Sequence, residues 1–579
     1  MSETVTKQAP WAPSIERHAQ RVARCDIDAL TAGMYNIPAA LAQMGYKGMR
    51  EGQSEPVNMM MAGQDTICVI PTGGGKTAVF VLPTLAMKWR TLVFSPLVAL
   101  MRDQEQNLQR QGVQAASMNG NKTESENLMA ARRWQAGELQ VLIVAPERLQ
   151  NASFLQAVKA VAPDLVVVDE AHVISDWSDG FRGDYCKVGD FITEFNPKVV
   201  AAFTATCTAR VQADIRRVLG LPQAKFHEHK ARRSNLILRT RELGDSDYPV
   251  VDALKEVSGS KIVYCSTIKR LEAMTAFLQS TMPGEHIVMF NGQMAQDAKR
   301  VAMDAFMSNE ASIVVATNAF GMGVDKPDVR AVVHADFPGS LEAIAQEIGR
   351  GGRDGKQSIC TTFYSKRAHT TQEYFIRMGN PPKETARKLF RRLQECADRQ
   401  GLVKMTEDSM SQAFTIQPPH VEACMETFDG HRVIERLTPE DKMIKVTIIA
   451  DDATLPLDSN DAKKYVTCCG KIRELGTQDT RGEWNCDLRL LSARMGLGEP
   501  TVRKALNVWH SNGMINFVQP FRGKITKIIG DLSLVDFDRL EEKAAMATTK
   551  LEQVLKYLSL PDGAHHAYLE SYFEGAENG

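Results

Sequence analysis

Residues 66–77 read TICVIPTGGGKT, a β-branched run that leads through a proline and three glycines to a lysine and a threonine. Glycines let backbone amides turn toward an anion, Lys76 adds a point charge, the Thr77 hydroxyl can ligate Mg²⁺, and a following helix adds its dipole. The generic pattern has a glycine at position 70, where this chain has isoleucine. We predict a phosphate-binding loop, a glycine-rich turn without a ligand being the weaker alternative. Its residues are Thr72, Gly73, Gly74, Gly75, Lys76 and Thr77.

Length, charge and cysteine content limit the kind of protein in which this loop occurs. A chain of 579 residues indicates about four domains at ~150 residues each. The 69 basic and 70 acidic residues almost cancel, which leaves nucleic acid possible as a partner because only a local basic face is needed. The eleven cysteines include no Cys-x-x-Cys pair, so we expect reduced, buried thiols. No apolar run approaches the ~20 residues of a membrane span.

Short β-branched runs alternate with helical stretches between residues 60 and 365. Near-continuous apolar runs are typical of strands buried on both faces, and intervening helices indicate parallel sheets. The runs are too many for one sheet, and a break near residues 232–247 separates two sets, so we predict two α/β lobes. The predicted strands are TICVI (66–70), TLVFS (91–95), VLIVA (141–145), DLVVVDE (164–170), KIVYC (261–265), SIVVAT (312–317) and AVVHA (331–335).

One of these strands ends in two acidic residues, Asp169 and Glu170. Hydrolysis of a nucleoside triphosphate needs one carboxylate to hold Mg²⁺ and a second group to orient or deprotonate the attacking water. We assign Asp169 to the metal and Glu170 to the water. Taken alone, the pair could equally cap a helix; beside the loop above, catalysis is the favoured interpretation.

The run DEAHVISDWSDGFRGDY (169–185) resembles the signature of the RecQ family of superfamily-2 DNA helicases. In that family the DEAH box continues into an aromatic-rich loop that senses single-stranded DNA, which implies that role for Trp177, Phe181 and Arg182. An aromatic face stacks a base at about 1–3 kcal/mol, and arginine adds charge and a planar surface. Core positions for the two aromatics are the alternative, which the neighbouring serine, aspartate and glycines disfavour.

The resemblance covers roughly residues 40–365. Residues 45–53, GYKGMREGQ, are similar to the family's adenine-reading motif, which implies nucleotide contacts by Tyr46, Arg50 and Gln53. The family's usual phenylalanines are Met44 and Met49 here. Three further stretches resemble first-lobe motifs: SPLVALMRDQ (95–104) and APERL (145–149), which implies DNA-backbone contact, and TAT (204–206), which implies a link between hydrolysis and lobe movement.

The stretch ATNAFGMGVDKPDVR (316–330) resembles a second-lobe motif of the family. The resemblance implies a DNA-backbone contact for Thr317 and a position on the nucleotide side for Asp325. Residues 290–294, FNGQM, depart from the family's His-Ala-Gly pattern, so the DNA contact of that motif is not carried over.

Residues 346–355 read QEIGRGGRDG. If the stretch begins as a helix, Gln346, Arg350 and Arg353 share one face at spacings of four and three. Such a face can reach a γ-phosphate held by the first lobe, and an arginine finger contributes about 10³–10⁵ in rate. A solvated basic helix end is the alternative, which the two glycines between the arginines disfavour.

Residues 499–513, EPTVRKALNVWHSNG, are predicted to form a helix with Val502, Ala505, Leu506 and Trp509 on its core face. With the preceding LRLLSARM (488–495) it makes a helix-turn-helix, and residues 514–529 read as a wing hairpin. We infer a winged helix, which is where RecQ proteins grip duplex DNA. A module for protein contact only is the alternative. The predicted DNA-facing residues are Arg503 and Lys504 on the helix and Phe521 at the wing tip, where it would help to part the strands.

The last segment, residues 550–575, faintly resembles the start of the RecQ zinc module. His565 and His566 stand where the family has its first cysteine, and the segment follows the winged helix instead of preceding it. We therefore predict no structural zinc, and we expect the two histidines at the surface, where adjacent histidines are more often found than as ligands.

Taken together, the patterns and the resemblance predict an α/β protein with two RecA-like parallel-sheet lobes, a helical region and a winged-helix domain. The predicted segments are an N-terminal extension (1–35), an ATP-binding lobe one (36–232), lobe two (233–366), a helical and irregular linker region (367–480), the winged helix (481–532) and a C-terminal helical tail (533–579).

The predicted function is an ATP-dependent DNA helicase of repair or recombination that uses Mg²⁺ and moves 3′ to 5′, a polarity that only the resemblance implies. Expected partners are single-stranded and duplex DNA; we expect a soluble, intracellular monomer (cytoplasm or nucleoid, or nucleus in a eukaryote) without membrane contact. An RNA helicase, or a translocase that does not unwind, is the main alternative. A catalytically silent DNA-binding scaffold is disfavoured by the intact Lys76, Asp169, Glu170, Arg350 and Arg353.

Overall fold

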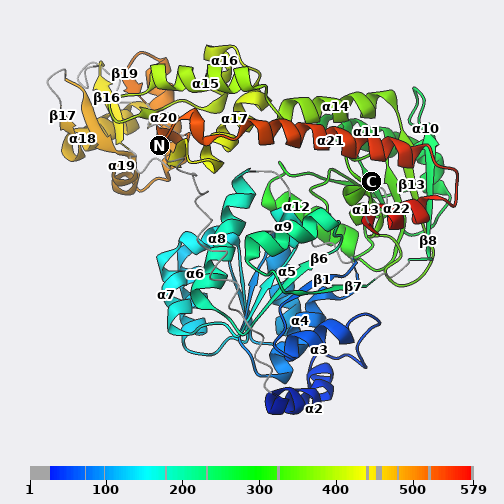
Figure 1. Cartoon of the computed structure of the whole chain (residues 1–579). Coiled ribbons are helices and arrows are strands. Elements are labelled where there is room, and N and C mark those ends of the chain that lie inside the picture. Colours follow the sequence, from blue (N-terminus) through cyan, green and yellow to red (C-terminus); the bar gives the residue numbers. More distant parts are fainter. Residues whose placement is uncertain are drawn as a thin grey trace, which may run out of the picture. The chain divides into compact units, whose positions relative to one another are not determined.

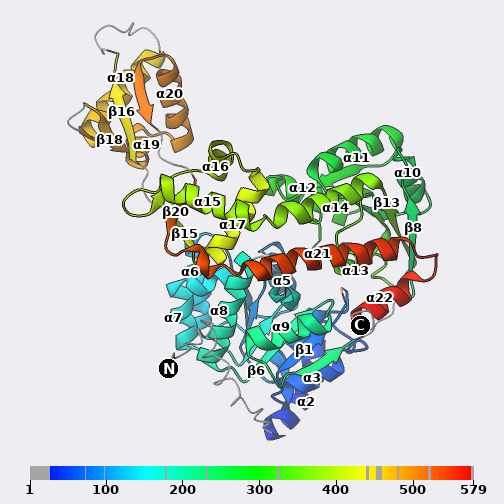
Figure 2. The same ribbon diagram turned by 45° about the horizontal axis from the view of Figure 1, so that its top comes forward.

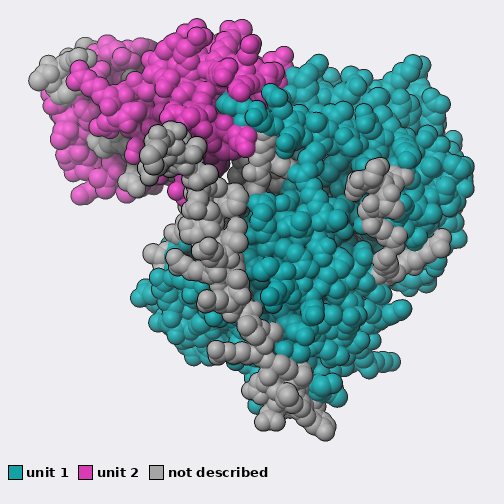
Figure 3. Space-filling view, viewed as in Figure 1, with its two compact units in different colours: residues 1–380, 537–579 teal, residues 381–536 magenta. Residues whose placement is uncertain are grey.

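The chain forms two compact units, of which the second is inserted into the first. Unit 1 comprises residues 1–380 and 537–579, and unit 2 comprises residues 381–536 (Figure 3). The computed structural model describes residues 27–71, 73–96, 98–175, 179–229, 233–321, 326–437, 443–450, 460–478, 482–518 and 523–574. The sequence predicted separate segments along the chain but not that its C-terminal residues would rejoin the first unit.

The first lobe of unit 1 is a seven-stranded parallel sheet in the order β3-β4-β2-β5-β6-β1-β7, with helices on both faces (Figure 1). Alternate residues of its central strands, such as Ile67 and Cys68, enter different cores on the two faces. The strands are β1 (Thr66–Val69), β2 (Thr91–Phe94), β3 (Ala115–Met118), β4 (Val141–Val144), β5 (Leu165–Val168), β6 (Val199–Thr204) and β7 (Lys225–Glu228). The helices are α2 (Ile27–Gln43), α3 (Ser54–Met61), α4 (Lys76–Ala86), α5 (Val98–Arg110), α6 (Glu124–Gln135), α7 (Ala152–Ala160), α8 (Asp179–Phe195) and α9 (Ala209–Leu219).

The second lobe is a six-stranded parallel sheet in the order β10-β11-β9-β12-β13-β8. The predicted break at residues 232–247 contains the edge strand β8, so the second lobe begins within it. The strands are β8 (Leu236–Glu242), β9 (Ser260–Tyr264), β10 (Ile287–Phe290), β11 (Ile313–Ala316), β12 (Val329–His334) and β13 (Ser358–Tyr364). The helices are α10 (Tyr248–Lys255), α11 (Ile268–Thr281), α12 (Gln296–Met307), α13 (Leu341–Ile348) and α14 (Lys366–Gly379). The two predicted parallel lobes are thus confirmed.

The C-terminal helices α21 (Phe537–Leu558) and α22 (His565–Glu574) belong to the core of the second lobe (Figure 2). Val554 and Tyr557 are fully buried there beside residues of α13 and β12. The expected surface position of the two histidines is wrong for His565, whose side chain is 0% exposed and whose Nε2 lies 3.3 Å from Thr240 Oγ1. His566 is half-buried, and its Nε2 lies 2.9 Å from Leu236 O. Packing of the hairpin on the sheet edge overrides the polar character of the pair.

Unit 2 contains two small antiparallel sheets. The first has the order β14-β20-β15 and the second the order β17-β18-β16-β19. The strands are β14 (Leu402–Val403), β15 (Ile434–Leu437), β16 (Met443–Ile448), β17 (Thr477–Gln478), β18 (Trp484–Asp487), β19 (Ile515–Val518) and β20 (Ile525–Ile528). The helices are α15 (Lys383–Cys396), α16 (Glu407–Phe414), α17 (Pro418–Gly430), α18 (Asn460–Leu475), α19 (Leu488–Met495) and α20 (Glu499–Ser511).

The predicted helix-turn-helix forms as α19 and α20, but the predicted wing hairpin over residues 514–529 is wrong. β19 pairs with β16, whereas β20 pairs with β14 and β15 in the other sheet. β19 pairs on one side with β16, from about 70 residues earlier, and β20 pairs with β14 and β15, so partners distant in the sequence compete with the local hairpin. A local turn signal could not reveal this competition, because strand pairing is decided by long-range partners.

The predicted core face of α20 is confirmed, with Val502, Leu506 and Trp509 buried and Ala505 half-buried against the same cluster. The cysteines of the described segments are free thiols, and all except the exposed Cys396 are buried, as the sequence led us to expect. Within the described part of the chain, no helix is both long and apolar enough to cross a membrane.

His565 predicts a pH dependence of folding stability. Burial lowers the pKa of this imidazole, against the opposing effect of Asp562. Because the folded pKa lies below the unfolded value of about 6.5, the unfolded state binds more protons on acidification. The free energy of unfolding should therefore fall as pH drops below about 6.5, and His565→Gln should flatten this dependence. Urea unfolding between pH 5 and 8 measures it, with the exposed His286→Gln as the control; identical slopes in both variants would contradict the assignment.

Candidate active site

The loop between β1 and α4 has the backbone that a phosphate cradle needs. Gly73 and Gly75 adopt φ of +85° and +78°, and Gly75 is the N-cap residue of α4, so the loop leads directly into a helix N-terminus. The positive φ favours glycine at position 75, and a Cβ there would lie 2.6 Å from Gln53 Nε2, so the Gln53 side chain would have to shift. Lys76 and Thr77 open α4, as predicted.

The residues before α3 (Ser54–Met61) support this loop from one side. Gln53 is 4% exposed; its Nε2 donates to Gly74 O at 2.9 Å, and its Oε1 accepts from the Arg50 amide at 2.8 Å. Arg50 Nη1 donates to Gly73 O at 3.0 Å. The exposed Tyr46 accepts a hydrogen bond from Gln111. The structure thus brings Arg50 and Gln53 to the loop, and base recognition by the three side chains remains a prediction.

Lys76 meets both predicted acids at the end of β5. Its Nζ lies 2.6 Å from Glu170 Oε1 and 3.8 Å from Asp169 Oδ1, and the two carboxylates are 7% and 2% exposed. Burial disfavours the ammonium, but Glu170 and Asp169 outweigh it, so the pKa of Lys76 is raised. Burial likewise opposes ionisation of Glu170, yet Lys76 and His172 leave its pKa lowered. Burial dominates at Asp169 and leaves its pKa raised.

Glu170 stands in a strained backbone position, with φ of +49°. Such a conformation costs about 1–3 kcal/mol in a residue other than glycine, and it is found most often at functional sites. His172 Nδ1 lies 3.3 Å from Glu170 Oε2 and 3.1 Å from Thr204 Oγ1, and that hydroxyl donates to Thr206 O at 2.8 Å. A continuous polar chain therefore joins Glu170 to the TAT stretch at the end of β6.

Two residues that the sequence analysis gave no role of their own lie against Asp169. Gln104 on α5 donates from Nε2 to Asp169 Oδ2 at 3.2 Å, and the hydroxyl of the fully buried Tyr185 donates to Asp169 O at 3.3 Å. Both occur inside stretches that the resemblance had marked, SPLVALMRDQ and DEAHVISDWSDGFRGDY. Pattern alone could not show that they converge on one carboxylate.

The arginines of the second lobe lie near the phosphate loop, but they do not lie on a helical face as predicted. α13 ends at Ile348, so Gln346, Arg350 and Arg353 do not share one helical face. Glycines at 349, 351 and 352 end the helix, and Gly352 has φ of +52°. A Cβ at Gly73 would nevertheless lie 3.4 Å from Arg353 Cγ, and Arg350, 3% exposed, is close enough to Glu170 to favour its ionised form. The two half-sites therefore meet within unit 1.

The arginine turn, residues 349–356, is held by the first described residues of the second lobe. Arg233 donates to Gly349 O and Gly351 O, at 2.9 and 2.5 Å. Asn235 Nδ2 donates to Gly352 O at 2.7 Å and to Lys356 O at 2.8 Å. The sequence analysis missed both residues because their partners lie more than 110 positions away.

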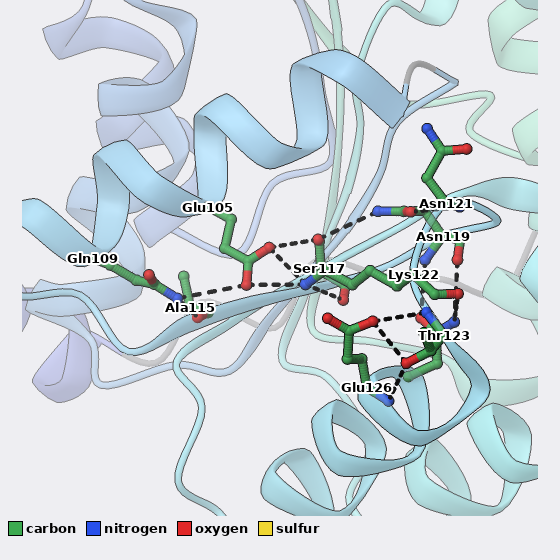
Figure 4. Close-up of polar contacts among 10 residues, drawn as sticks. Glu105, Gln109, Ala115, Ser117, Asn119, Asn121, Lys122, Thr123 and Glu126 are labelled. Atoms are coloured by element: carbon green, nitrogen blue, oxygen red, sulfur yellow. Dashed lines mark hydrogen bonds and ion pairs between the residues drawn. The ribbon is translucent and has the colours of Figure 1, made fainter. Parts of the chain in front are cut away.

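Contacts near the strand ends of the first lobe also hold the region for which the resemblance implied DNA-backbone contact. Lys122 Nζ donates to Glu105 Oε2 at 2.8 Å, and Ser117 Oγ donates to the same oxygen at 2.6 Å (Figure 4). Arg148 of the APERL stretch donates to Asn119 O at 2.6 Å. Glu105, which directly follows the SPLVALMRDQ stretch, and Arg148 of the APERL stretch thus both bind one loop, residues 119–123, at the edge where parallel sheets bind ligands.

Of the remaining predicted site residues, the structure describes only some. Thr317 follows β11 and is 8% exposed. In unit 2, Lys504 is exposed on α20, and Arg503 is half-buried with Glu499 at 4.0 Å. Several predicted residues lie outside what the structure describes: Thr72, Trp177, Asp325 and Phe521 entirely, and Phe181 and Arg182 in their side chains.

The site can now be compared with known proteins. Residues 50–215 match the model of the DEAD/DEAH box helicase domain, and residues 249–355 match that of the helicase conserved C-terminal domain. The boundaries enclose the phosphate loop and the acids in one match and the arginine turn in the other. These two domains define the class: a helicase with two motor lobes.

The relatives narrow the class to a family. The chain is 33% identical over 359 residues to the probable ATP-dependent DNA helicase RecS of Bacillus subtilis, a match that covers 61% of this chain and 72% of RecS. It is 31% identical to the ATP-dependent DNA helicase RecQ of the same organism, covering 61% of this chain and 60% of RecQ. The chain belongs to the RecQ family of DNA helicases. A solved structure of the DUF1998 helicase MrfA bound to DNA superimposes with a TM-score of 0.49 at 19% identity, covering 59% of this chain and 53% of that chain, and adds nothing to the assignment.

Lys76→Ala is predicted to abolish ATP turnover while leaving most DNA affinity. The substitution removes the charge that faces the phosphates and leaves two buried carboxylates without their cation, so turnover should fall by at least roughly 10²-fold. Phosphate release and DNA binding by fluorescence anisotropy, measured on the same preparation, separate the two effects. Turnover equal to the wild type would refute the site.

Arg353→Ala is predicted to lower kcat for ATP by about 10³-fold, as expected for loss of an arginine finger, with a small change in ATP affinity. Arg330→Ala provides a matched control, because Arg330 binds the same turn through Asp354 but is not placed at the phosphate loop. Steady-state kinetics with saturating DNA measure both variants. An equal loss in the two would indicate damage to the turn and not loss of a finger.

Proposed function

We propose that this protein is an ATP-dependent DNA helicase that moves 3′ to 5′ along single-stranded DNA and unwinds duplex DNA in repair or recombination. The observation that carries the proposal is the convergence of Lys76, the buried acids and Arg353 on one glycine loop, from two lobes of the same unit. Membership of the RecQ family supports DNA as the substrate and 3′-to-5′ as the direction of movement.

The position of Lys76 supports a role for ATP binding itself in starting the reaction. In the structure its ammonium contacts Glu170 at 2.6 Å, and ATP phosphates would compete for that charge. When Lys76 turns to the phosphates, Glu170 is released from this ion pair, and its carboxylate oxygen can accept a hydrogen bond from the attacking water. Binding of the substrate thereby prepares the group that acts on the water.

The residues present fit a magnesium ion. Thr77 and Asp169 offer a hydroxyl and a carboxylate, the hard oxygen ligands that Mg²⁺ prefers. Among the described residues, the Asp169 carboxylate accepts from the Gln104 amide and the Glu170 N–H, and Lys76 lies 3.8 Å away. Bound there, the ion would neutralise charge on the phosphates. Gln104 and the backbone contact of Tyr185 would hold Asp169 in place.

The positions of the arginines and of the TAT stretch support a coupling between ATP hydrolysis and movement along DNA. ATP would contact Lys76 in the first lobe and Arg350 and Arg353 in the second, so it would bind best when the two lobes are together. A ligand shifts such an equilibrium only by its differential affinity for the two arrangements. DNA held by strand-end loops of both lobes would move stepwise as ATP binds and leaves, and the chain from Glu170 to Thr206 joins the reacting group to the lobe interface.

A 3′-tailed duplex tests the function. Wild-type protein with ATP and Mg²⁺ should separate the strands, a 5′-tailed duplex should remain paired, and Lys76→Ala should unwind neither. Single-stranded DNA should stimulate phosphate release more than RNA of the same sequence. Stronger stimulation by RNA would favour the RNA-helicase alternative, and stimulation by DNA without strand separation would favour a translocase.

A further inference from the structure

The C-terminal hairpin, α21 and α22, contacts the helix that leads into the arginine turn. On α22, the hydroxyl of Tyr572 donates to Glu342 Oε1 at 2.8 Å; on α21, Lys550 Nζ lies 3.1 Å from the same oxygen. Glu342 stands in the first turn of α13, and both hairpin helices run beside α13 in Figures 1 and 2. The hairpin is thus joined to a motor element 200 residues earlier in the chain.

This contact is buried and charge-assisted. Tyr572 is 5% exposed, and burial together with the neighbouring Glu342 raises its pKa, so it remains a hydrogen-bond donor. Burial opposes ionisation of Glu342, but Lys550 outweighs it and leaves the pKa of the carboxyl lowered. A hydrogen bond to an ionised carboxylate in such surroundings is roughly twice as strong as a neutral one, so it can fix the first turn of α13.

The other end of the same element is fixed independently. Arg233 and Asn235 bind the carbonyl groups of the arginine turn directly after α13 ends. α13 spans only eight residues, Leu341–Ile348, so its first turn and the arginine turn lie about two helical turns apart. Releasing its first turn would therefore let the helix pivot about the Arg233 contacts and displace the arginines that follow it.

The hairpin also reaches the first lobe. Met546 on α21 accepts a hydrogen bond from Arg210 on α9. On α22, Leu569 and Phe573 line a cavity of about 410 Å³ that is also lined by Pro71, next to the phosphate loop, and Thr206 of the TAT stretch. The hairpin therefore contacts α13 and borders both lobes close to the residues that surround the nucleotide.

We propose that the C-terminal hairpin is a positioning element for ATP hydrolysis, in which Tyr572 and Lys550 hold Glu342 so that α13 presents Arg350 and Arg353 to the phosphate loop. The proposal rests on the ATPase activity proposed above. Displacement of catalytic groups by about 1 Å costs roughly 10²-fold in rate, so a contact remote from the phosphates can control kcat. Because unit 2 is inserted between α14 and α21, its chain continues directly into this hairpin.

Tyr572→Phe tests the proposal in the full-length protein, because it removes one hydroxyl and keeps the ring in the core. Tyr568→Phe is the matched control: its hydroxyl donates to Gln553 O within the hairpin, and the residue is similarly buried. We expect kcat of DNA-stimulated hydrolysis to fall at least fivefold in Tyr572→Phe, with KM for ATP within twofold of the wild type and no such loss in the control. Glu342→Gln should retain more activity than Glu342→Ala, since the amide oxygen still accepts from Tyr572.

Hydrogen–deuterium exchange supplies a readout that does not depend on turnover. Backbone amides of residues 341–356 should exchange faster in Tyr572→Phe than in the wild type, while those of β9 and β11 should stay unchanged. Equal exchange in residues 341–356 would overturn the proposal whatever the ATPase result. Faster exchange with wild-type kcat would also overturn it, by showing that the contact only stabilises the fold. A wild-type protein without DNA-stimulated hydrolysis would instead refute the proposed function.

Discussion

The arrangement of this protein depends on a buried cluster of opposite charges, Lys76 with Asp169 and Glu170. Taking such groups out of water is costly, and the cost is recovered only when the charges lie within hydrogen-bonding distance and their remaining atoms find partners. Here Gln104 on α5 and the Glu170 N–H donate to the two Asp169 carboxylate oxygens, and Tyr185 on α8 donates to the Asp169 carbonyl oxygen. The His172 ring, in the turn after β5, lies 3.3 Å from Glu170 Oε2. The cluster fixes the phosphate loop against the end of β5, and it leaves a lysine whose present partner can be exchanged for a phosphate.

The two parallel sheets make this cluster possible. In each lobe the carboxyl ends of neighbouring strands meet at one edge, so groups that follow different strands converge without long loops. Glycines then bring the second lobe to the first: they end α13 before Arg350 and leave room at Gly73 for the Arg353 side chain. Glu170 itself occupies a strained conformation, which the surrounding hydrogen bonds maintain.

The C-terminal hairpin changes how the domains of the chain are understood. Viewed along the sequence it is a tail that follows an accessory region, whereas in the fold it is part of the second lobe, with Tyr557 and Val554 in its core. Unit 2 is consequently an insertion with both of its ends attached to the motor. The same long-range pairing explains the missing wing, because β19 pairs with β16 and β20 pairs with strands of the other sheet.

The sequence by itself determined the two lobes, the phosphate loop and the acids at the end of a strand, because strand burial and glycine spacing are local properties with few alternatives. It also indicated that Arg350 and Arg353 would approach the nucleotide, although through a helical face that does not form. Only the tertiary structure decided the positions of Gln104, Tyr185, Arg233 and Tyr572, the burial of His565 and the partner of β19. In each of these cases the deciding contact joins residues far apart in the chain, and side-chain chemistry alone does not specify which of many distant partners packing will bring within reach.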